Sequence, residues 1–391
     1  MTGPSTDEET GPSLHVFLIA GEPSGDVLGA RLMAALKRRH DGQIRFSGIG
    51  GPLMATEGLK SLYPLEDFAV MGLLEVLPHV MQIRKKIQAL VARISADSPD
   101  VLVTIDAPGF SLRVSRQLKG QGPKLVHYVA PSVWAWKPWR ARDIAGFLDC
   151  LLTLLPFEPP LFELHGLKSV FVGHPAVEAR SGIAAPTTDT TDPLLCLLPG
   201  SRRGEVRRLL PVFRLAVARL SSDFPGLTCV LPSVPGVVDL VRAETQDWPV
   251  PLRVVEGAEE KREAIATSTV ALAASGTVAV ELAVAGLPAV IAYRINPLTA
   301  AIAKRLIKLR FVSLPNILLD REVQPERLQW DCTPEALADV LRPLLSDQQA
   351  RARQQEGYRE VVKMLTPPGG LTPSEQAADS LLSLALSARG S

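Results

Sequence analysis

Apolar runs that end in a tight turn and continue into a helical pattern recur along this sequence. Residues 194–198 run into a turn at Gly200 and Ser201, and residues 270–274 run into a turn at Ser275 and Gly276. Residues 14–20 end in the same way, in the hexapeptide GEPSGD. Buried strands that alternate with helices are typical of a parallel sheet with helices on both faces. The recurring pattern therefore predicts an α/β fold.

The same pattern predicts most of the elements of the chain. The expected strands cover residues 14–20, 44–49, 101–105, 124–129, 150–154, 194–198, 228–231, 252–255, 270–274 and 289–293. The expected helices include residues 27–39, 81–95 and 111–119. We predict two doubly wound Rossmann-like domains that face each other across a cleft, with ligands at the carboxyl ends of the strands.

Composition shifts suggest where the domains begin and end. The polar, acidic start of the chain is expected to be a disordered leader, and the small, polar, proline-bearing stretch 181–193 a linker or surface loop. The expected divisions are the leader at 1–13, an N-terminal domain at 14–180, a C-terminal domain at 194–350, and C-terminal helices at 351–391. We expect those last helices to pack back on the N-terminal domain or on a partner subunit.

Charge and cysteine content exclude several classes of protein. A net charge of +1 gives no overall field that would attract nucleic acid. The 4 cysteines show no metal-ligand spacing and are typical of thiols in a reducing compartment. No apolar run reaches the roughly 18 residues of a membrane span. We expect a cytosolic protein that can still touch a membrane surface.

Two turns in the C-terminal half carry the chemistry of a phosphate site. Backbone N–H groups at helix starts, together with Arg202, favour anions such as phosphate. Glu281, early in the helix after Thr277, can accept hydrogen bonds from a ribose diol. A diphosphate cradle beside a diol acceptor is the outline of a nucleotide-sugar site. The alternative is an exposed helix face on which Glu205 partners Arg202, with Glu281 as an ordinary surface residue.

Further candidates are polar residues of the N-terminal half and Asn316 in the C-terminal half. Asp106 ends the run 101–105, where a carboxylate can remove a proton from an attacking hydroxyl, or can bond its own turn. Ser24 and Asp26 are candidates either for ligand contact or for helix capping. His174 is a secondary candidate for ligand contact, and Asn316 can read a base or a sugar hydroxyl or simply form a turn.

Two surfaces rich in apolar residues suggest further contacts. Trp134, Trp136 and Trp139 lie among basic residues, and we interpret them as an amphipathic wall or as packing rather than a nucleic-acid platform. The apolar run 68–81 is either a buried helix or an interfacial membrane patch, with residues 298–310 as a second, basic candidate. The patch would consist of Phe68, Val70, Met71, Leu73, Leu74, Val76 and Leu77.

Eight short blocks of the sequence resemble a known family. They are GEPSGD (21–26), DAPGF (106–110), HYVAPSVWAWKPWR (127–140), LPFE (155–158), VGHP (172–175), PGSRRGEV (199–206), ASGT (274–277) and SLPNILL (313–319). In this order they are similar to the lipid-A-disaccharide synthase family. The blocks extend over most of the chain, and several are long and of unusual composition.

The resemblance implies an inverting glycosyltransferase of the two-Rossmann-domain (GT-B) type. Such an enzyme transfers the sugar of UDP-2,3-diacylglucosamine to 2,3-diacylglucosamine 1-phosphate (lipid X) and releases UDP. The product is the β-1′,6-linked lipid A disaccharide 1-phosphate, and neither a metal nor a cofactor is implied.

The family also implies roles for residues of this chain. Asp106 and Arg202 would be catalytic, and the acceptor would enter from the N-terminal domain. The substrate-binding residues would be Gly200, Ser201, Ser275, Gly276, Thr277, Glu281, Asn316, His174, Ser24 and Asp26. A homodimer is also implied, as is peripheral contact with the cytoplasmic face of the inner membrane.

Rival functions remain for a chain of this architecture. One rival is another UDP-sugar enzyme, such as a 2-epimerase or a MurG-like transferase, but those lack the block at 127–140. The other is a non-catalytic UDP-sugar sensor, which would tolerate loss of Asp106.

Overall fold

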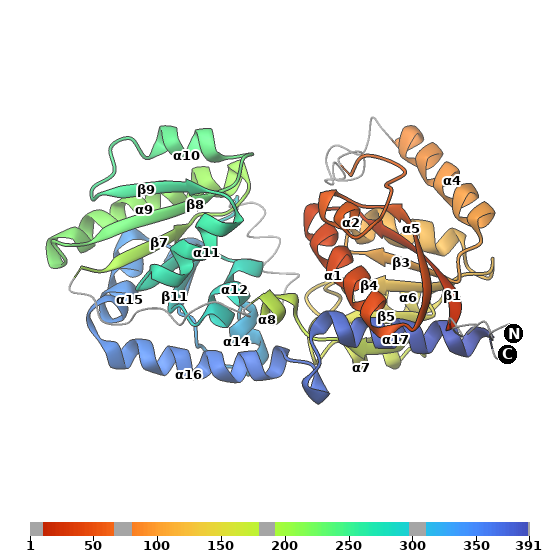
Figure 1. The fold of residues 1–391 in the computed structure, drawn as a ribbon. Helices are drawn as coiled ribbons and strands as arrows, with labels where there is room; N and C mark the ends of the chain where they lie inside the picture. The colour runs from red at the N-terminus through yellow and green to blue at the C-terminus, as the bar shows by residue number, and fades with distance from the viewer. Residues whose placement is uncertain (1–10, 66–79, 180–191, 297–309, 390–391) are drawn as a thin grey trace, which may run out of the picture. The chain divides into compact units, whose positions relative to one another are not determined.

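The computed structural model describes residues 11–65, 80–179, 192–296 and 310–389. The chain divides into two compact units (Figure 1). Unit 1 comprises Met1–Pro175 and Leu365–Ser391, and unit 2 comprises Ala176–Met364. The C-terminal boundary differs from the expected residue 351 because the helix at 348–365 is bonded mainly to unit 2.

Unit 1 is built on a parallel sheet with the strand order β2-β1-β3-β4-β5-β6. Its strands are β1 (Gly11–Ala20), β2 (Gly42–Ile49), β3 (Val101–Ile105), β4 (Lys124–Tyr128), β5 (Cys150–Thr153) and β6 (Lys168–Phe171). Its helices are α1 (Pro23–Arg39), α2 (Pro52–Thr56), α4 (Val80–Asp97), α5 (Pro108–Gln117), α6 (Arg140–Ala145), α7 (Pro159–Glu163), η2 (Pro368–Gly370) and α17 (Pro373–Arg389). Helix α8 (Pro175–Ala179) lies at the boundary between the units.

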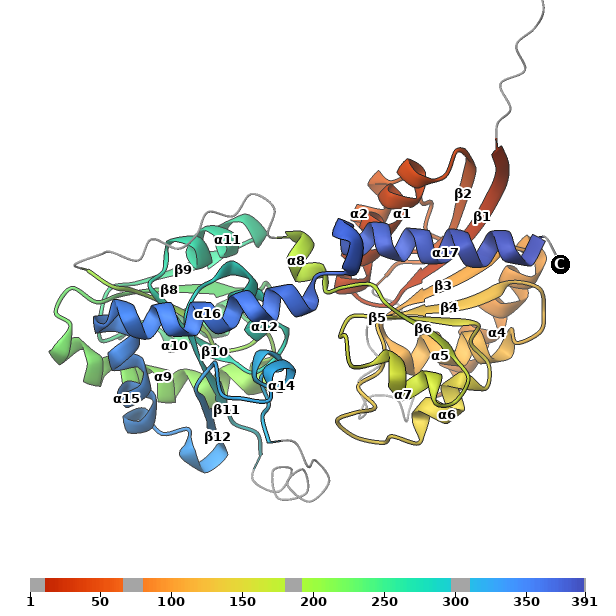
Figure 2. The same cartoon turned by 90° about the horizontal axis from the view of Figure 1, so that it is seen from below.

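Every residue of β3 is buried, because helices cover both faces of the sheet. Val101 and Val103 pack with residues of α1 and α17, whereas Leu102 packs with residues of α4 and α5. Figures 1 and 2 show α1 and α17 running beside each other over one face. Strands buried on both faces read as continuous apolar runs, which is why they were visible in the sequence.

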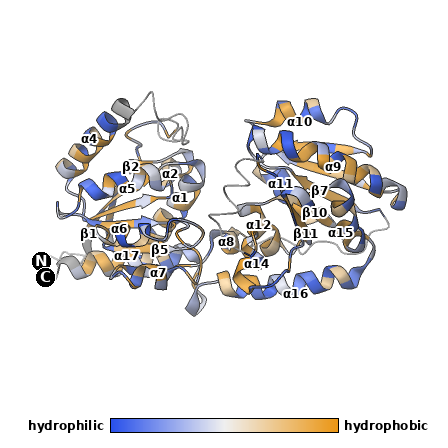
Figure 3. Ribbon diagram, turned by 180° about the vertical axis from the view of Figure 1, so that it is seen from behind, coloured by the Kyte–Doolittle hydropathy of each residue, from blue (hydrophilic) through white to orange (hydrophobic). Residues whose placement is uncertain are grey.

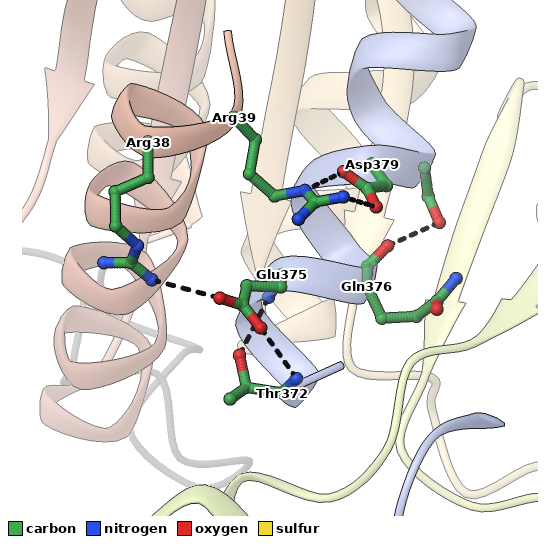
Figure 4. Close-up of polar contacts among 7 residues, drawn as sticks. Arg38, Arg39, Thr372, Glu375, Gln376 and Asp379 are labelled. Carbon is green, nitrogen blue, oxygen red and sulfur yellow. Dashed lines mark hydrogen bonds and ion pairs between the residues drawn. The ribbon is translucent and has the colours of Figure 1, made fainter. Parts of the chain in front are cut away.

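Helix α17 joins unit 1 from the far end of the chain. Thr372 and Glu375 cap its start reciprocally, since each backbone N–H donates to the side chain of the other, at 2.9 and 3.3 Å. Figure 4 shows the Arg39 guanidinium facing Asp379, with Nη2 2.6 Å from Oδ2, and Arg38 facing Glu375. These ion pairs lie at the surface, so the buried apolar face of α17 stabilises the docking more than they do.

Unit 2 repeats the architecture with the strand order β12-β11-β10-β7-β8-β9, again all parallel. Its strands are β7 (Leu194–Leu198), β8 (Thr228–Ser233), β9 (Leu252–Glu256), β10 (Val270–Ala274), β11 (Ala289–Tyr293) and β12 (Glu326–Leu328). Its helices are α9 (Arg203–Asp223), α10 (Val238–Glu244), α11 (Ala258–Thr267), α12 (Thr277–Ala285), α14 (Leu314–Leu319), η1 (Gln329–Asp331), α15 (Pro334–Ser346) and α16 (Gln348–Leu365).

The helices of unit 2 also cover both faces of its sheet. Helices α9 and α15 pack in one apolar cluster, and α11 and α12 in the other. Coloured by hydropathy, the strands are largely hydrophobic and the outer helices mixed (Figure 3). On α16, Gln354 bonds to both the N–H and the C=O of Ala289, which fixes that helix against β11.

Both sheets contain a point at which the strand order reverses. In unit 1 the chain passes from β1 to β2 and then crosses to β3, on the other side of β1. In unit 2 it passes from β7 through β8 to β9 and then crosses to β10, on the other side of β7. Connections that leave neighbouring strands in opposite directions open a crevice at their carboxyl ends. These two points, β1/β3 and β7/β10, are where sites are expected.

The expected strands are confirmed, mostly to within two residues at each end. Strands β6 and β12 were missed because they are short and begin with a charged residue: β6 (KSVF) holds only two apolar residues and β12 (ERL) only one. The longer edge strands β2 and β9 were predicted.

Several expectations fall outside the described residues. They include the whole apolar patch at 68–77, most of the linker at 181–193, and nearly all of the basic segment 298–310. Strand β1 begins at Gly11, inside the expected leader. In the part of the chain that is described, no helix combines the length and the apolar character that crossing a membrane requires.

The packing of α17 predicts which of its residues matter for stability. Leu381 is only 2% exposed within the core of unit 1, whereas Leu386 on the same helix is 49% exposed. Leu381→Ala should lower the free energy of unfolding of unit 1 by about 2–4 kcal/mol, because it leaves a cavity. Leu386→Ala should change it by less than about 0.5 kcal/mol. Urea unfolding compares the two variants, and equal effects would show that α17 is not held by its apolar face.

Candidate active site

A cavity of about 650 Å³ lies within unit 2 at the β7/β10 reversal. Its walls come from the ends of β7, β8 and β10 and from the starts of α9, α11 and α12. Of the residues predicted to bind the nucleotide in this half, all but Asn316 line it, namely Gly200, Ser201, Arg202, Ser275, Gly276, Thr277 and Glu281. The structure thus brings together two turns that lie more than seventy residues apart in the sequence.

The turn after β7 is shaped by Gly200 and Glu205. Gly200 has φ +108°, and a Cβ at that position would lie 2.4 Å from the Glu205 carboxylate, so only glycine fits. Glu205 accepts hydrogen bonds from the backbone N–H of Arg202, at 3.4 Å, and from its guanidinium, at 3.3 Å. Arg202 occupies the N-cap position of the 21-residue helix α9, where the helix dipole favours an anion.

The Arg202 side chain is exposed at the wall of the cavity. It is 84% exposed, and an ion pair that exposed contributes about 0–1 kcal/mol. Its guanidinium can therefore leave Glu205 for a phosphate at little cost. Glu205 does pair with Arg202, as expected if α9 only presents an exposed face there. Arg202 nevertheless also lines the cavity.

The turn after β10 supplies the second side of the cavity. Helix α12 starts at Thr277 without a side-chain cap, so its first N–H groups have no such partner at the cavity wall. Glu281, one turn further on, forms an ion pair with Lys261 of α11, with Nζ 2.5 Å from Oε2.

Several lining residues were not predicted from the sequence. Lys261 stands in a run of charged residues typical of an exposed helix, and only the packing of α11 beside α12 brings it to the cavity. Ser233, at the end of β8, also lines the cavity, and its buried Oγ has no hydrogen-bond partner among the described residues. Neither residue stands in a recognisable motif, so the sequence carried no signal for them.

At the β1/β3 reversal in unit 1, Asp106 and Ser24 come together. Ser24 Oγ lies 3.4 Å from Asp106 Oδ2, a long hydrogen bond, while Oδ1 accepts from the N–H of Ala107 at 2.8 Å. Asp106 and Ala107 both have left-handed backbone, with φ +52° and +45°. A Cβ on Gly21 would lie 2.4 Å from the Ala107 Cβ, so the two turns meet closely there. Asp106 thus bonds its own turn and also directs one oxygen toward Ser24.

Asp26 does not belong to this group. It is 3% exposed, and its carboxylate accepts from the N–H groups of Gly51, Leu53 and Met54 at 2.8–3.0 Å. It therefore caps the start of α2, and both of its oxygens are occupied. Capping, one of the two roles considered for Asp26, is what these hydrogen bonds show, although the helix it caps is α2 rather than its own. Its contact with a substrate stays a prediction.

Asn316 and His174 are not among the residues that line the cavity. Asn316 is fully buried, and its amide bonds to Val323, Gln324 and Glu326, which satisfies both ends of the side chain. It holds the turn before β12 and is not among the cavity-lining residues. His174 is 7% exposed in unit 1, where its N–H donates to the C=O of Leu365 at 2.9 Å.

The tryptophan segment divides into a buried part and an exposed part. Trp134 donates to Glu158 at 3.2 Å and packs edge-on against Phe157, whereas Trp136 and Trp139 are 44% and 67% exposed. Burial raises the pKa of Glu158 to about 7, although hydrogen bonds from Leu155 and Trp134 work against the shift.

Known proteins of one family match this chain over nearly its whole length. A model of the family described as lipid-A-disaccharide synthetase matches residues 16–379. The lipid-A-disaccharide synthase of Rhodospirillum centenum is 49% identical over 95% of this chain and 94% of its own length. That of Paramagnetospirillum magneticum is 47% identical over 94% of this chain and 96% of its own length. This chain belongs to the lipid-A-disaccharide synthetase family. It is therefore a glycosyltransferase, as the sequence motifs implied.

Solved structures agree with the GT-B fold. MnaA of S. aureus, solved with UDP, has a TM-score of 0.61 at 13% identity and covers 94% of this chain and 95% of its own. MurG of Acinetobacter baumannii has a TM-score of 0.51 at 17% identity and covers 90% of this chain and 99% of its own. At these identities the likeness shows the fold alone.

The raised pKa of Glu158 predicts a pH dependence of stability. Because the pKa rises from 4.5 to about 7 on folding, the stabilisation is fully present below 4.5 and is lost as pH rises through 7. The free energy of unfolding of unit 1 should therefore fall by roughly 3 kcal/mol across that window. Glu158→Gln should flatten the fall, and Glu163→Gln, an exposed control on α7, should not. Urea unfolding at pH 5 and pH 8 makes the comparison, and parallel curves for all three proteins would refute the prediction.

Proposed function

We propose that this chain transfers the sugar of UDP-2,3-diacylglucosamine to lipid X, forming the β-1′,6-linked disaccharide 1-phosphate and UDP. The main support for a donor site is that the turns after β7 and β10 line the same cavity in unit 2. The diphosphate would lie against the starts of α9 and α12, and Glu281 would accept hydrogen bonds from the ribose. Charge develops on UDP as the glycosidic bond breaks, and Arg202 would stabilise it.

The acceptor is proposed to bind at the β1/β3 reversal of unit 1. Asp106 would take the proton of the attacking 6-hydroxyl, with Ser24 as a neighbouring contact. What supports this is the carboxylate at a strand end, its left-handed backbone, and its oxygen directed toward Ser24. Direct displacement of an α-linked UDP would give the β link and hence inversion. No step of this scheme calls for a metal or a cofactor.

We also propose that the enzyme binds the cytoplasmic face of the inner membrane peripherally and works as a homodimer. The support is the sequence of the patch Phe68–Leu77 and the diacyl character of the substrates. Each buried methylene contributes about 0.8 kcal/mol to membrane binding.

A UDP-release assay with the purified chain, both lipids and EDTA tests the reaction. We expect UDP release that needs both lipids, with the disaccharide 1-phosphate confirmed by mass. Tight binding of the donor without turnover would favour a sensor, and turnover abolished by EDTA would contradict the metal-free mechanism.

Asp106→Asn tests the proposed base. The variant should bind the UDP-sugar as the wild type does but turn over about 10²–10⁴-fold more slowly, because the amide cannot accept the proton. Single-turnover kinetics at saturating donor would measure the chemical step. A rate near that of the wild type would remove Asp106 from the mechanism.

Arg202→Ala tests the proposed diphosphate contact. Loss of a charge-assisted hydrogen bond of roughly 1.5–3 kcal/mol should lower kcat/KM about 10- to 100-fold. Arg207, an exposed residue of the same helix that does not line the cavity, provides the matched control. Arg207→Ala should keep the wild-type value, and equal losses in both variants would indicate a general effect of positive charge on α9.

A further inference from the structure

Lys261 forms an ion pair with Glu281, the residue proposed to bind the ribose. Its Nζ lies 2.5 Å from Oε2 of Glu281, and both side chains line the cavity at about one-third exposure, 35% and 38%. The two residues come from neighbouring helices, α11 and α12, which pack in one apolar cluster on the same face of the sheet. The ion pair therefore spans two elements at the rim of a ligand-sized space.

Hydrogen bonds hold the backbones of α11 and α12, the helices that carry Lys261 and Glu281. Lys261 lies in the first turn of α11, where its N–H donates to Gly257 at 3.1 Å. Helix α12 is held by the buried Gln324, whose amide donates to the C=O of Ala279 at 3.0 Å. Gln324 is itself held by Ser313, at 2.7 Å. Because both helix starts are anchored, the choice of Glu281 rotamer depends on what meets its carboxylate at the tip.

The carboxylate has capacity left after it meets Lys261. Within the described part of the chain, the hydrogen bond from Lys261 to Oε2 is the polar contact that the Glu281 side chain makes. An ionised carboxylate offers about four acceptor sites on its two oxygens. The remaining sites match two neighbouring hydroxyls, which a ribose carries and a 2′-deoxyribose does not.

We propose that Lys261 is a positioning residue for nucleotide recognition: it holds the Glu281 carboxylate in the orientation that accepts the ribose diol. This rests on the proposed function, since it needs the nucleoside diphosphate to lie in this cavity. Without the ammonium group, the long Glu281 side chain would have to be ordered by the ligand alone. The cost of ordering it would then weaken binding of the ribonucleotide.

Binding of UDP and of 2′-deoxy-UDP to the full chain, measured by calorimetry, tests the proposal. The wild type should prefer UDP about tenfold or more, because 2′-deoxy-UDP lacks one hydroxyl for Glu281. In Lys261→Met, UDP should bind about five- to tenfold more weakly while 2′-deoxy-UDP changes little, so that the preference collapses. Lys261→Arg should retain most of it. In turnover, Lys261→Met should raise the donor KM and leave kcat at saturating donor unchanged.

Two controls separate this role from an ordinary surface ion pair. Arg262 is the next residue on α11 and pairs with Glu259 at 2.6 Å outside the cavity, so Arg262→Met should bind both nucleotides as the wild type does. Adding Lys261→Met to Glu281→Gln should cause no further loss, because the two residues act as one unit. Lys261→Gln replaces the methionine variant if that variant does not fold.

Each failure has its own meaning. An unchanged preference for UDP in folded Lys261→Met, or an additive loss in the double variant, would overturn the positioning role. Failure of the wild type to bind either nucleotide would overturn the proposed function instead. Equal weakening of both nucleotides in Lys261→Met would show that the lysine contacts the diphosphate or the base rather than orienting Glu281, and would also overturn the proposal.

Discussion

The chemistry of this chain depends on burial of parallel strands on both faces. The strands at the centre of each sheet, such as β3 and β10, are buried at every residue. A polar side chain within them would need a partner inside the core. Ligand-binding groups can therefore collect only where the strands end, and the reversal of strand order decides which ends stay open. Each unit has its own candidate site at such a point.

Polar side chains near these strand ends either bind the backbone of the protein's own helices and turns or face the cavity. Their hydrogen bonds show which of the two each side chain does. The first N–H groups of every helix need acceptors, and a buried carboxylate such as Asp26 satisfies them from another element. The side-chain oxygen of Asn316 likewise accepts from backbone N–H groups, those of the turn before β12. The starts of α9, α11 and α12 all line the cavity, and those of α11 and α12 have a glycine at the N-cap and so no side-chain cap. Helix starts left uncapped at an open crevice are where an anion has donors to meet.

The sequence predicted what depends on neighbours along the chain. The central strands, the turns at Gly200 and Ser275, and the position of Arg202 all follow from local strand–turn–helix patterns. Lys261 could not be predicted, because its role depends on α11 packing beside α12, twenty residues further along the chain. The helix that Asp26 caps could not be predicted either, because the N–H groups that donate to its carboxylate lie 25–28 residues further along the chain. The short strands β6 and β12 were missed because each holds too few apolar residues to form a run.

Backbone strain in unit 1 indicates how Asp106 is held. Three residues without glycine's freedom adopt positive φ at the ends of β3 and β4: Asp106 at +52°, Ala107 at +45° and Val129 at +83°. Each such residue costs about 1–2 kcal/mol, and most for a β-branched side chain such as valine. The neighbouring strands enforce the geometry, since Asp106 donates its N–H to Tyr128 and Val129 donates to Leu152. Because the strands on either side fix these φ angles, the Asp106 carboxylate is held in one orientation at the carboxyl edge of the sheet, which is what the proposed base requires.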